Sequence, residues 1–140
     1  MEIKIPPLRA RKPLTELFGR IIRISQKHGL NDALKIIGIE IHDIEKFSNC
    51  NKKTIQHIER NNYDIIIETI PSEKNVFLYI SPKELTHNLL KGLNSKINQI
   101  MSMTVLIGKI NNYELRFGVY GIPCDELGRS MIQNGRLLRR

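Results

Sequence analysis

Tryptophan is absent from this chain of 140 residues, and only 6% of the residues are aromatic. There are two cysteines, Cys50 and Cys124, and neither has a histidine at metal-ligand spacing, so the pattern indicates neither a zinc site nor a disulfide framework. No apolar run is long enough to span a bilayer, and the first residues lack the apolar core of a signal peptide. We therefore expect a soluble, cytoplasmic protein without a metal, a cofactor or a membrane partner.

The groupings of an active site are missing as well. The sequence has no glycine-rich phosphate loop, no carboxylate pair beyond Asp125-Glu126, and histidines that fall on four different predicted elements: His28, His42, His57 and His87. Nothing in the pattern points to a bound small molecule. We expect that the protein is not an enzyme.

Positive charge, by contrast, is in excess. The net charge is +8 and the pI is near 9.7, so an anionic partner is indicated, with nucleic acid first and an anionic membrane surface second. Residues 1–62 hold twelve Lys/Arg against seven Asp/Glu, or +5, whereas residues 63–140 hold ten against seven, or +3. A hydrophobic content of 41% excludes wholesale disorder.

Two short apolar-patterned runs flank the turn Asn49-Cys50-Asn51, and their spacing predicts a helix-turn-helix. Asn49 tolerates the left-handed backbone of a sharp turn, and Asn51 can cap the helix that follows. The second run begins with two lysines, and its remaining polar side chains fall on the face opposite its isoleucines: Gln56, His57 and Arg60. This run is therefore predicted to be a basic recognition helix.

From Ile39 to Asn61 the order IEIHDIEKFSNCNKKTIQHIERN resembles the DNA-reading helix-turn-helix of LacI-type repressors. The positions that carry the resemblance are Asp43, Ile44, Thr54, Ile55 and Ile58. It covers about 23 of the 140 residues and implies the motif alone, without the family's large effector domain. By position, the resemblance implies that Lys52, Lys53 and His57 read base edges in the major groove of double-stranded DNA.

The remaining DNA contacts are expected around this helix. Gln56 would reach base edges, and Arg60, Arg20 or Arg23 would hold the backbone. The complete set of predicted DNA-binding residues is Asn51, Lys52, Lys53, Gln56, His57, Arg60, Lys74, Arg20 and Arg23.

Other elements are predicted on both sides of the motif. Residues 1–13 should form an extended basic arm, because Pro6, Pro7 and Pro13 oppose a helix. Helices should follow from Thr15 to about residue 28 and over 32–37. Residues 63–70 and 76–80 predict a β-hairpin, which can be the wing of a winged helix-turn-helix, with Lys74 near the DNA, or ordinary core sheet, and the two are compatible.

The second half should contain a long helix and another hairpin. Ser81-Pro82-Lys83-Glu84 has the pattern of a capping box, and an apolar seam extends from it to about Met101. This helix either forms a homodimer through residues 82–101 or covers the chain's own sheet. Residues 103–110 and 113–120 predict a hairpin that turns at Asn111-Asn112, and the tail from Cys124 predicts a short helix with a basic end.

The expected fold is thus α+β: a helical, possibly winged, helix-turn-helix bundle followed by a β-β-α-β-β half. The expected domains are a helix-turn-helix domain with its hairpin wing in residues 14–80, and residues 81–140, whose long helix, second hairpin and basic tail serve dimerisation or regulation. The leading functional hypothesis is a small sequence-specific DNA-binding transcriptional regulator. Two alternatives stay open: a non-enzymatic protein-interaction, chaperone or assembly component that uses the long helix and second hairpin, and an RNA-binding protein.

Overall fold

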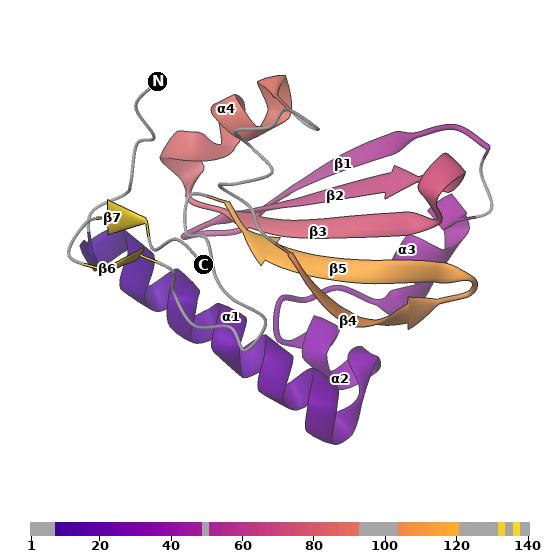
Figure 1. Ribbon diagram of the computed structural model, residues 1–140, viewed down its shortest axis with the longest axis horizontal. Coiled ribbons are helices and arrows are strands. Elements are labelled where there is room, and N and C mark those ends of the chain that lie inside the picture. The colour runs from indigo at the N-terminus through magenta and orange to yellow at the C-terminus, as the bar shows by residue number, and fades with distance from the viewer. Residues whose placement is uncertain (1–7, 49–50, 93–103, 121–131, 134–135, 138–140) are drawn as a thin grey trace.

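The computed structural model describes residues 8–48, 51–92, 104–120, 132–133 and 136–137. Three helices come first, followed by a five-stranded mixed sheet with a short helix between its third and fourth strands, so the fold is α+β (Figure 1). The helices are α1 Leu8–His28, α2 Leu30–Lys35, α3 Ile41–Ser48 and α4 Thr86–Lys91. None of the described helices is both long and apolar enough to cross a bilayer.

The order of the strands in the sheet is β1-β2-β3-β5-β4. Their bounds are β1 Thr54–Glu59, β2 Asp64–Ile70, β3 Asn75–Ser81, β4 Val105–Ile110 and β5 Tyr113–Val119. Neighbouring strands are antiparallel except β3 and β5, which are parallel and join the two hairpins into one sheet. Two short 3-10 turns, η1 Pro71–Glu73 and η2 Lys83–Leu85, flank β3.

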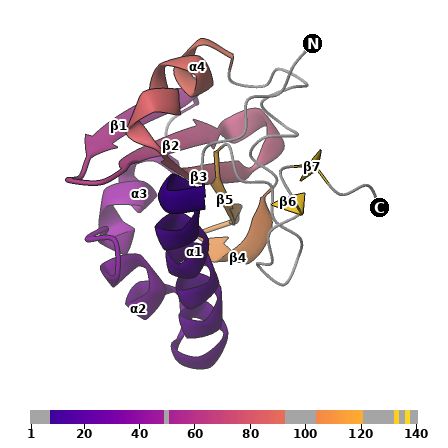
Figure 2. The ribbon, with the colours of Figure 1, turned by 90° about the vertical axis from the view of Figure 1, so that its left-hand side faces the viewer.

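Helices α1 to α3 cover one face of this sheet, which we call the inner face, and α4 lies on the other, the outer face (Figure 2). The inner core is largely apolar because β2, β3 and β5 alternate, with isoleucine, leucine and valine side chains turned toward the helices. Thr69, which pairs with Val76, is a buried polar residue on this face. Phe18 of α1 stacks on Phe117 of β5, with ring centroids 5.1 Å apart.

Helix α1 begins earlier than the sequence predicts. Residues 8–13, assigned to the extended arm, belong to the helix, and Pro13 lies inside it. One proline in the second turn removes a single backbone hydrogen bond, whereas burial of a stripe at helical spacing stabilises the whole element: Leu14, Phe18, Ile21 and Ile22. The prediction was wrong for these six positions, and residues 1–7 lie outside the description.

The prediction of a recognition helix was also wrong. The first helix of the motif is present as α3, but Thr54 to Glu59 form strand β1, paired with β2 along its whole length. Ile55 and Ile58 fit a helical spacing, yet the run also alternates, with Ile55, His57 and Glu59 exposed and their neighbours half-buried. The seven buried residues of β2 supply a partner for a strand, and this pairing overrides the local helical pattern. The turn residues Asn49 and Cys50 lie outside the description.

The two predicted hairpins are confirmed, but the first is not a wing. Strands β2 and β3 occupy the centre of the sheet, between β1 and β5, which is the core-sheet alternative. Lys74 has φ 55° at their connection, and Asn111 has φ 54° at the turn between β4 and β5.

Within the predicted helix over 82–101, the described residues form η2 and α4. Residues 93–103 lie outside the description. The capping box is not formed, because η2 has no side-chain cap and Ser81 is the last residue of β3. Leu89 packs on the chain's own sheet, as one of the two alternatives for the apolar seam predicts. In the tail, strands β6 Ile132–Gln133 and β7 Arg136–Leu137 stand where a short helix was expected.

Candidate functional site

The outer face of the sheet differs from the inner one in what covers it. Helix α4 has six residues and packs over one end of the face, where Leu89 contacts a cluster that includes Ile66, Tyr79 and Tyr120. Burial there raises the pKa of the Tyr120 hydroxyl. Among the described residues, no other helix packs on this face. The rest of the outer face is therefore the candidate site.

One row of side chains crosses all five strands beside the α4 cluster. Directly paired residues point to the same side of a sheet, so the register places five side chains in line on the outer face: Ile55, Glu68, Phe77, Arg116 and Leu106. We call these residues the outer row. Ile55 is 48% exposed and Leu106 is 47% exposed, and they are the exposed large hydrophobic residues of the described chain. They stand at the two ends of the row, on the two edge strands.

The middle of the outer row is amphipathic. Phe77 is half-buried, and its ring stacks with Tyr79, with centroids 6.1 Å apart. Arg116 is half-buried, and its Nη2 lies 3.2 Å from Oε2 of Glu114 on the same strand. Apolar and charged groups thus alternate along the row, with Glu68 on one side of Phe77 and Arg116 on the other.

Glu68 is the unusual member of the row. Its side chain is fully buried, and its one ionic partner is Lys53, whose Nζ lies 2.9 Å from Oε2. The contact lacks the angles of a hydrogen bond, so neither carboxylate oxygen has a hydrogen-bond partner among the described residues. A buried carboxylate is costly unless it is fully paired, and a hydrophobic residue at this position would serve the fold better.

Asp64 holds α4 against the sheet. Its Oδ1 accepts a hydrogen bond from Lys83 at 2.9 Å and its Oδ2 accepts one from Thr86 at 2.7 Å, while His57 Nε2 lies 3.5 Å from Oδ2. Burial alone would raise the pKa of this carboxyl, but the hydrogen bonds from Lys83 and Thr86, with the charges of Lys83 and His57, outweigh burial and bring the pKa below its ordinary value. The carboxyl is therefore ionised and anchors the helix.

The same corner contains the cluster of described residues that could hold a metal ion. Ligand atoms of His57, Glu59 and Asp64 lie within 4.8 Å of one another. Both oxygens of Asp64 already accept hydrogen bonds, one of them from the ammonium of Lys83, and a cation would have to compete with that charge. The arrangement fits a structural anchor better than a metal centre.

The predicted DNA-binding residues do not form one surface. Lys53 and His57 point to the outer face, where they contact Glu68 and Asp64, and Gln56 points to the inner side. Asn51 and Lys52 lie in the exposed bend before β1. The strand that carries them does not present them to a DNA groove as a helix.

The other four residues lie outside β1, at three different places in the fold. Arg60 clamps the end of α2: its Nε and Nη2 donate to the carbonyl of Ile37 at 3.2 and 3.1 Å, and Nη2 also donates to Gly38. A cation there satisfies carbonyls left free at a helix end. Lys74 lies over the ring of Tyr113, 5.1 Å from its centroid. Arg20 and Arg23 are exposed on α1.

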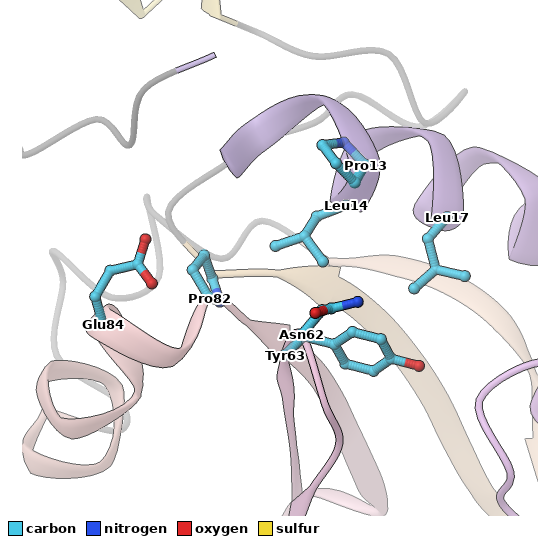
Figure 3. Close-up of a pocket in the computed structure, with 7 residues that line it drawn as sticks. All are labelled: Pro13, Leu14, Leu17, Asn62, Tyr63, Pro82 and Glu84. Carbon is cyan, nitrogen blue, oxygen red and sulfur yellow. The ribbon is translucent and has the colours of Figure 1, made fainter. Parts of the chain in front are cut away.

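A pocket of about 360 Å³ opens between α1, the β1–β2 turn and η2 (Figure 3). Four of its lining residues are apolar, Pro13, Leu14, Leu17 and Pro82, and three carry polar groups, Asn62, Tyr63 and Glu84. This volume is at the lower end of the range of small-molecule sites. No charged group of the pocket is buried, since Glu84 is exposed.

The sequence reasoning missed Ile55, Glu68 and Leu106 as candidate residues. A signal was available for Glu68, because its carboxylate follows three isoleucines and interrupts the apolar run of a buried strand. Exposure of Ile55 and Leu106 depends on which strands are at the edges, which the sequence does not show.

The search for relatives yields no match: no protein-family model, no curated protein and no solved structure is similar to the chain.

Proposed function

We propose that this chain is a non-enzymatic protein-interaction component, of the assembly or chaperone class, that binds a segment of a partner protein across the outer row. The observation that carries the proposal is the placement of Ile55 and Leu106, the two exposed large hydrophobic residues of the described chain, at opposite ends of one row with Phe77 between them.

Single exposed apolar residues are common and mean little. Here, however, the two are aligned, with the half-buried Phe77 and Arg116 and the fully buried Glu68 between them. Strands are about 4.8 Å apart, so a row across five of them is about 19 Å long. This length suits a helix of a few turns or a short extended peptide. Apolar side chains of such a segment would contact Ile55, Phe77 and Leu106.

The charges on the outer row indicate what else the segment carries. Lys53 and Arg116 flank Phe77 on the same face, and each is partly exposed beside one carboxylate of the chain. An acidic side chain of the partner would be attracted to both cations, and the net charge of +8 would favour its approach. The partner segment is thus expected to be apolar and acidic.

Site-specific photocrosslinking in living cells that express the chain tests the proposal. A benzophenone amino acid is placed at Ile55, at Leu106 or, as the control, at Gln26 on the exposed side of α1. Positions 55 and 106 should give adducts with the same protein, identified by mass spectrometry, and position 26 should not. For that protein in purified form, Ile55→Ser with Leu106→Ser should weaken binding by about tenfold or more, with Gln26→Ser as the matched control.

Absence of a protein adduct at both 55 and 106, or equal yields of one adduct at all three positions, would refute the proposal.

A second candidate function has its own observation. Arg20, Arg23 and Lys27 are exposed along one side of α1, at a spacing of three and four residues, and none of them has a recorded ion pair. Such a stripe suits contacts to the phosphates of DNA or RNA without reading bases. The double variant Arg20→Glu/Lys27→Glu should then lower retention on both nucleic acids and flatten its salt dependence, while Ile55→Ser should leave both unchanged.

A further inference from the structure

Strand β1 has one edge that pairs with β2 and another that pairs with nothing in the described chain. The hairpin bond in which the Arg60 N–H donates to the Tyr63 carbonyl, at 3.0 Å, fixes which groups face that open edge. In an antiparallel pair, hydrogen-bonded and non-hydrogen-bonded positions alternate. Counting back from Arg60, positions 58, 56 and 54 bond to β2, so the N–H and C=O groups of Ile55, His57 and Glu59 point outward.

These outward groups restrict how a second strand can add. Three donors and three acceptors on every second residue are ready for another strand, and β1 has neither a proline nor a bulge to prevent it. If the added strand is β1 of a second copy, a two-fold axis requires odd-numbered positions to pair with odd-numbered positions, because only these face outward in both copies. Three registers satisfy this condition with most of the strand overlapping, centred on Ile55, on Gln56 or on His57.

We propose that β1 pairs antiparallel with β1 of a second copy, in the register centred on Gln56. In this register Lys53 of each copy stands opposite Glu59 of the other, so the pair forms twice, on the outer face. Ile55, which is 48% exposed, stands opposite His57 of the second copy. The register centred on His57 would instead put Ile55 against Glu59, and the one centred on Ile55 would leave Glu59 facing Asn51 beyond the strand.

The contacts of Lys53 agree with this arrangement. Its side chain is 42% exposed and meets Glu68 from the open edge of the sheet, so its ammonium can lie between Glu68 of its own copy and Glu59 of the other. Glu59 is exposed and forms no ion pair with another described residue. The second copy thus supplies Lys53 with a carboxylate in addition to Glu68.

This self-association goes beyond the proposed function and does not depend on it. It uses the edge of β1, whereas the outer row lies on the face of the sheet, and Leu106 is on β4 at the opposite edge. It also differs from the dimer through residues 82–101 that the sequence suggests. A crosslink from position 106 to another protein would stand whether or not copies associate through β1.

Cysteine crosslinking tests the register in the full chain. In a background of Cys50→Ser and Cys124→Ser, single variants Gln56→Cys, Ile55→Cys and His57→Cys are oxidised mildly. Position 56 lies on the proposed axis, in a non-hydrogen-bonded pair whose Cα atoms are about 4.5 Å apart, which a disulfide can bridge. Gln56→Cys should form disulfide-linked dimers at least about tenfold faster than either neighbour. Faster crosslinking at 55 or 57 would overturn the register.

Sedimentation equilibrium tests the association without cysteines. The parent chain of 16.2 kDa should show a mass that rises with concentration toward twice that value. Glu59→Lys, which leaves the Lys53–Glu68 pair intact, should weaken self-association by about tenfold or more, and a mixture of Glu59→Lys with Lys53→Glu chains should restore it. A monomer at every concentration, or a Glu59→Lys variant that associates like the parent, would overturn the proposal; circular dichroism verifies that each variant is folded.

Discussion

The two faces of the sheet are built on different principles. The inner face is a mainly apolar layer under α1 to α3, where Phe18 and Phe117 stack and the buried apolar side chains form one cluster. The outer face contains the buried charges Asp64 and Glu68 and ends in two exposed apolar residues.

The two faces differ in whether burial of their side chains stabilises the fold. Burial of the inner layer drives folding, because apolar area is removed from water without the desolvation of charge. Glu68 on the outer face opposes folding, since its carboxylate is buried and its ionic partner among the described residues is the partly exposed Lys53. Residues that cost stability in a fold and are placed on its least covered face are the ones to examine for binding.

The largest loss of stability is expected from a substitution in the core under the inner face. Phe18→Ala removes a ring that is fully buried and stacked on Phe117, and it should lower the free energy of unfolding by about 3–5 kcal/mol. Urea denaturation followed by circular dichroism measures the change, and Gln26→Ala on the exposed side of the same helix is the control. A loss under about 1 kcal/mol would show that the inner layer is not the core.

On the outer face, Lys53→Met leaves the Glu68 carboxylate buried without a partner. We expect a loss of about 1–3 kcal/mol in the free energy of unfolding, below the value for a fully buried pair because Lys53 is partly exposed. The double variant Lys53→Met/Glu68→Met should recover most of this loss, since it removes the charge as well. If Lys53→Met alone is as stable as the parent, the pair does not matter to the fold.

Acid should lower the stability that Asp64 contributes on the outer face. Because the folded-state pKa of Asp64 is lowered, this group contributes stability above its unfolded pKa of about 3.9, and the contribution is lost as the pH falls through the folded pKa. Asp64→Asn should therefore be less stable than the parent near pH 7 by roughly 1–2 kcal/mol and should lose less on acidification below pH ~4. Thr86→Val, which removes one of the two hydrogen bonds to Asp64, should be intermediate.

The smallest effect is expected at the ends of the outer row. Ile55→Ser and Leu106→Ser should change the free energy of unfolding by no more than about 0.5 kcal/mol each, because both side chains are about half exposed. Ile65→Ser, at a buried inner position of β2, is the matched contrast and should cost several times as much. A large loss at Ile55 or Leu106 would mean that these residues serve the fold rather than a partner.

Local signals in the sequence were sufficient for several elements. The helical stripe of α1, the alternation of β5 and the turn at Asn111 all follow from short-range patterns that agree with the structure. The segment from Thr54 to Glu59 failed because isoleucines three apart fit a helical spacing, whereas in the strand the same spacing places Ile55 and Ile58 on opposite faces. Its positive charges then suggested a groove-reading surface, whereas Lys53 in fact pairs with the chain's own Glu68.

The sequence by itself determined the α+β class, both hairpins and the apolar layer, because periodicity and turn residues act over a few positions of the chain. Tertiary structure alone decided that β1 is a strand, that it forms one edge of the sheet and that β4 forms the other. It also decided that Ile55 and Leu106 stand in one row. The physical reason is that strand order, register and edge position are set by pairing between residues distant in the chain, and no local pattern encodes which strand will have a free side.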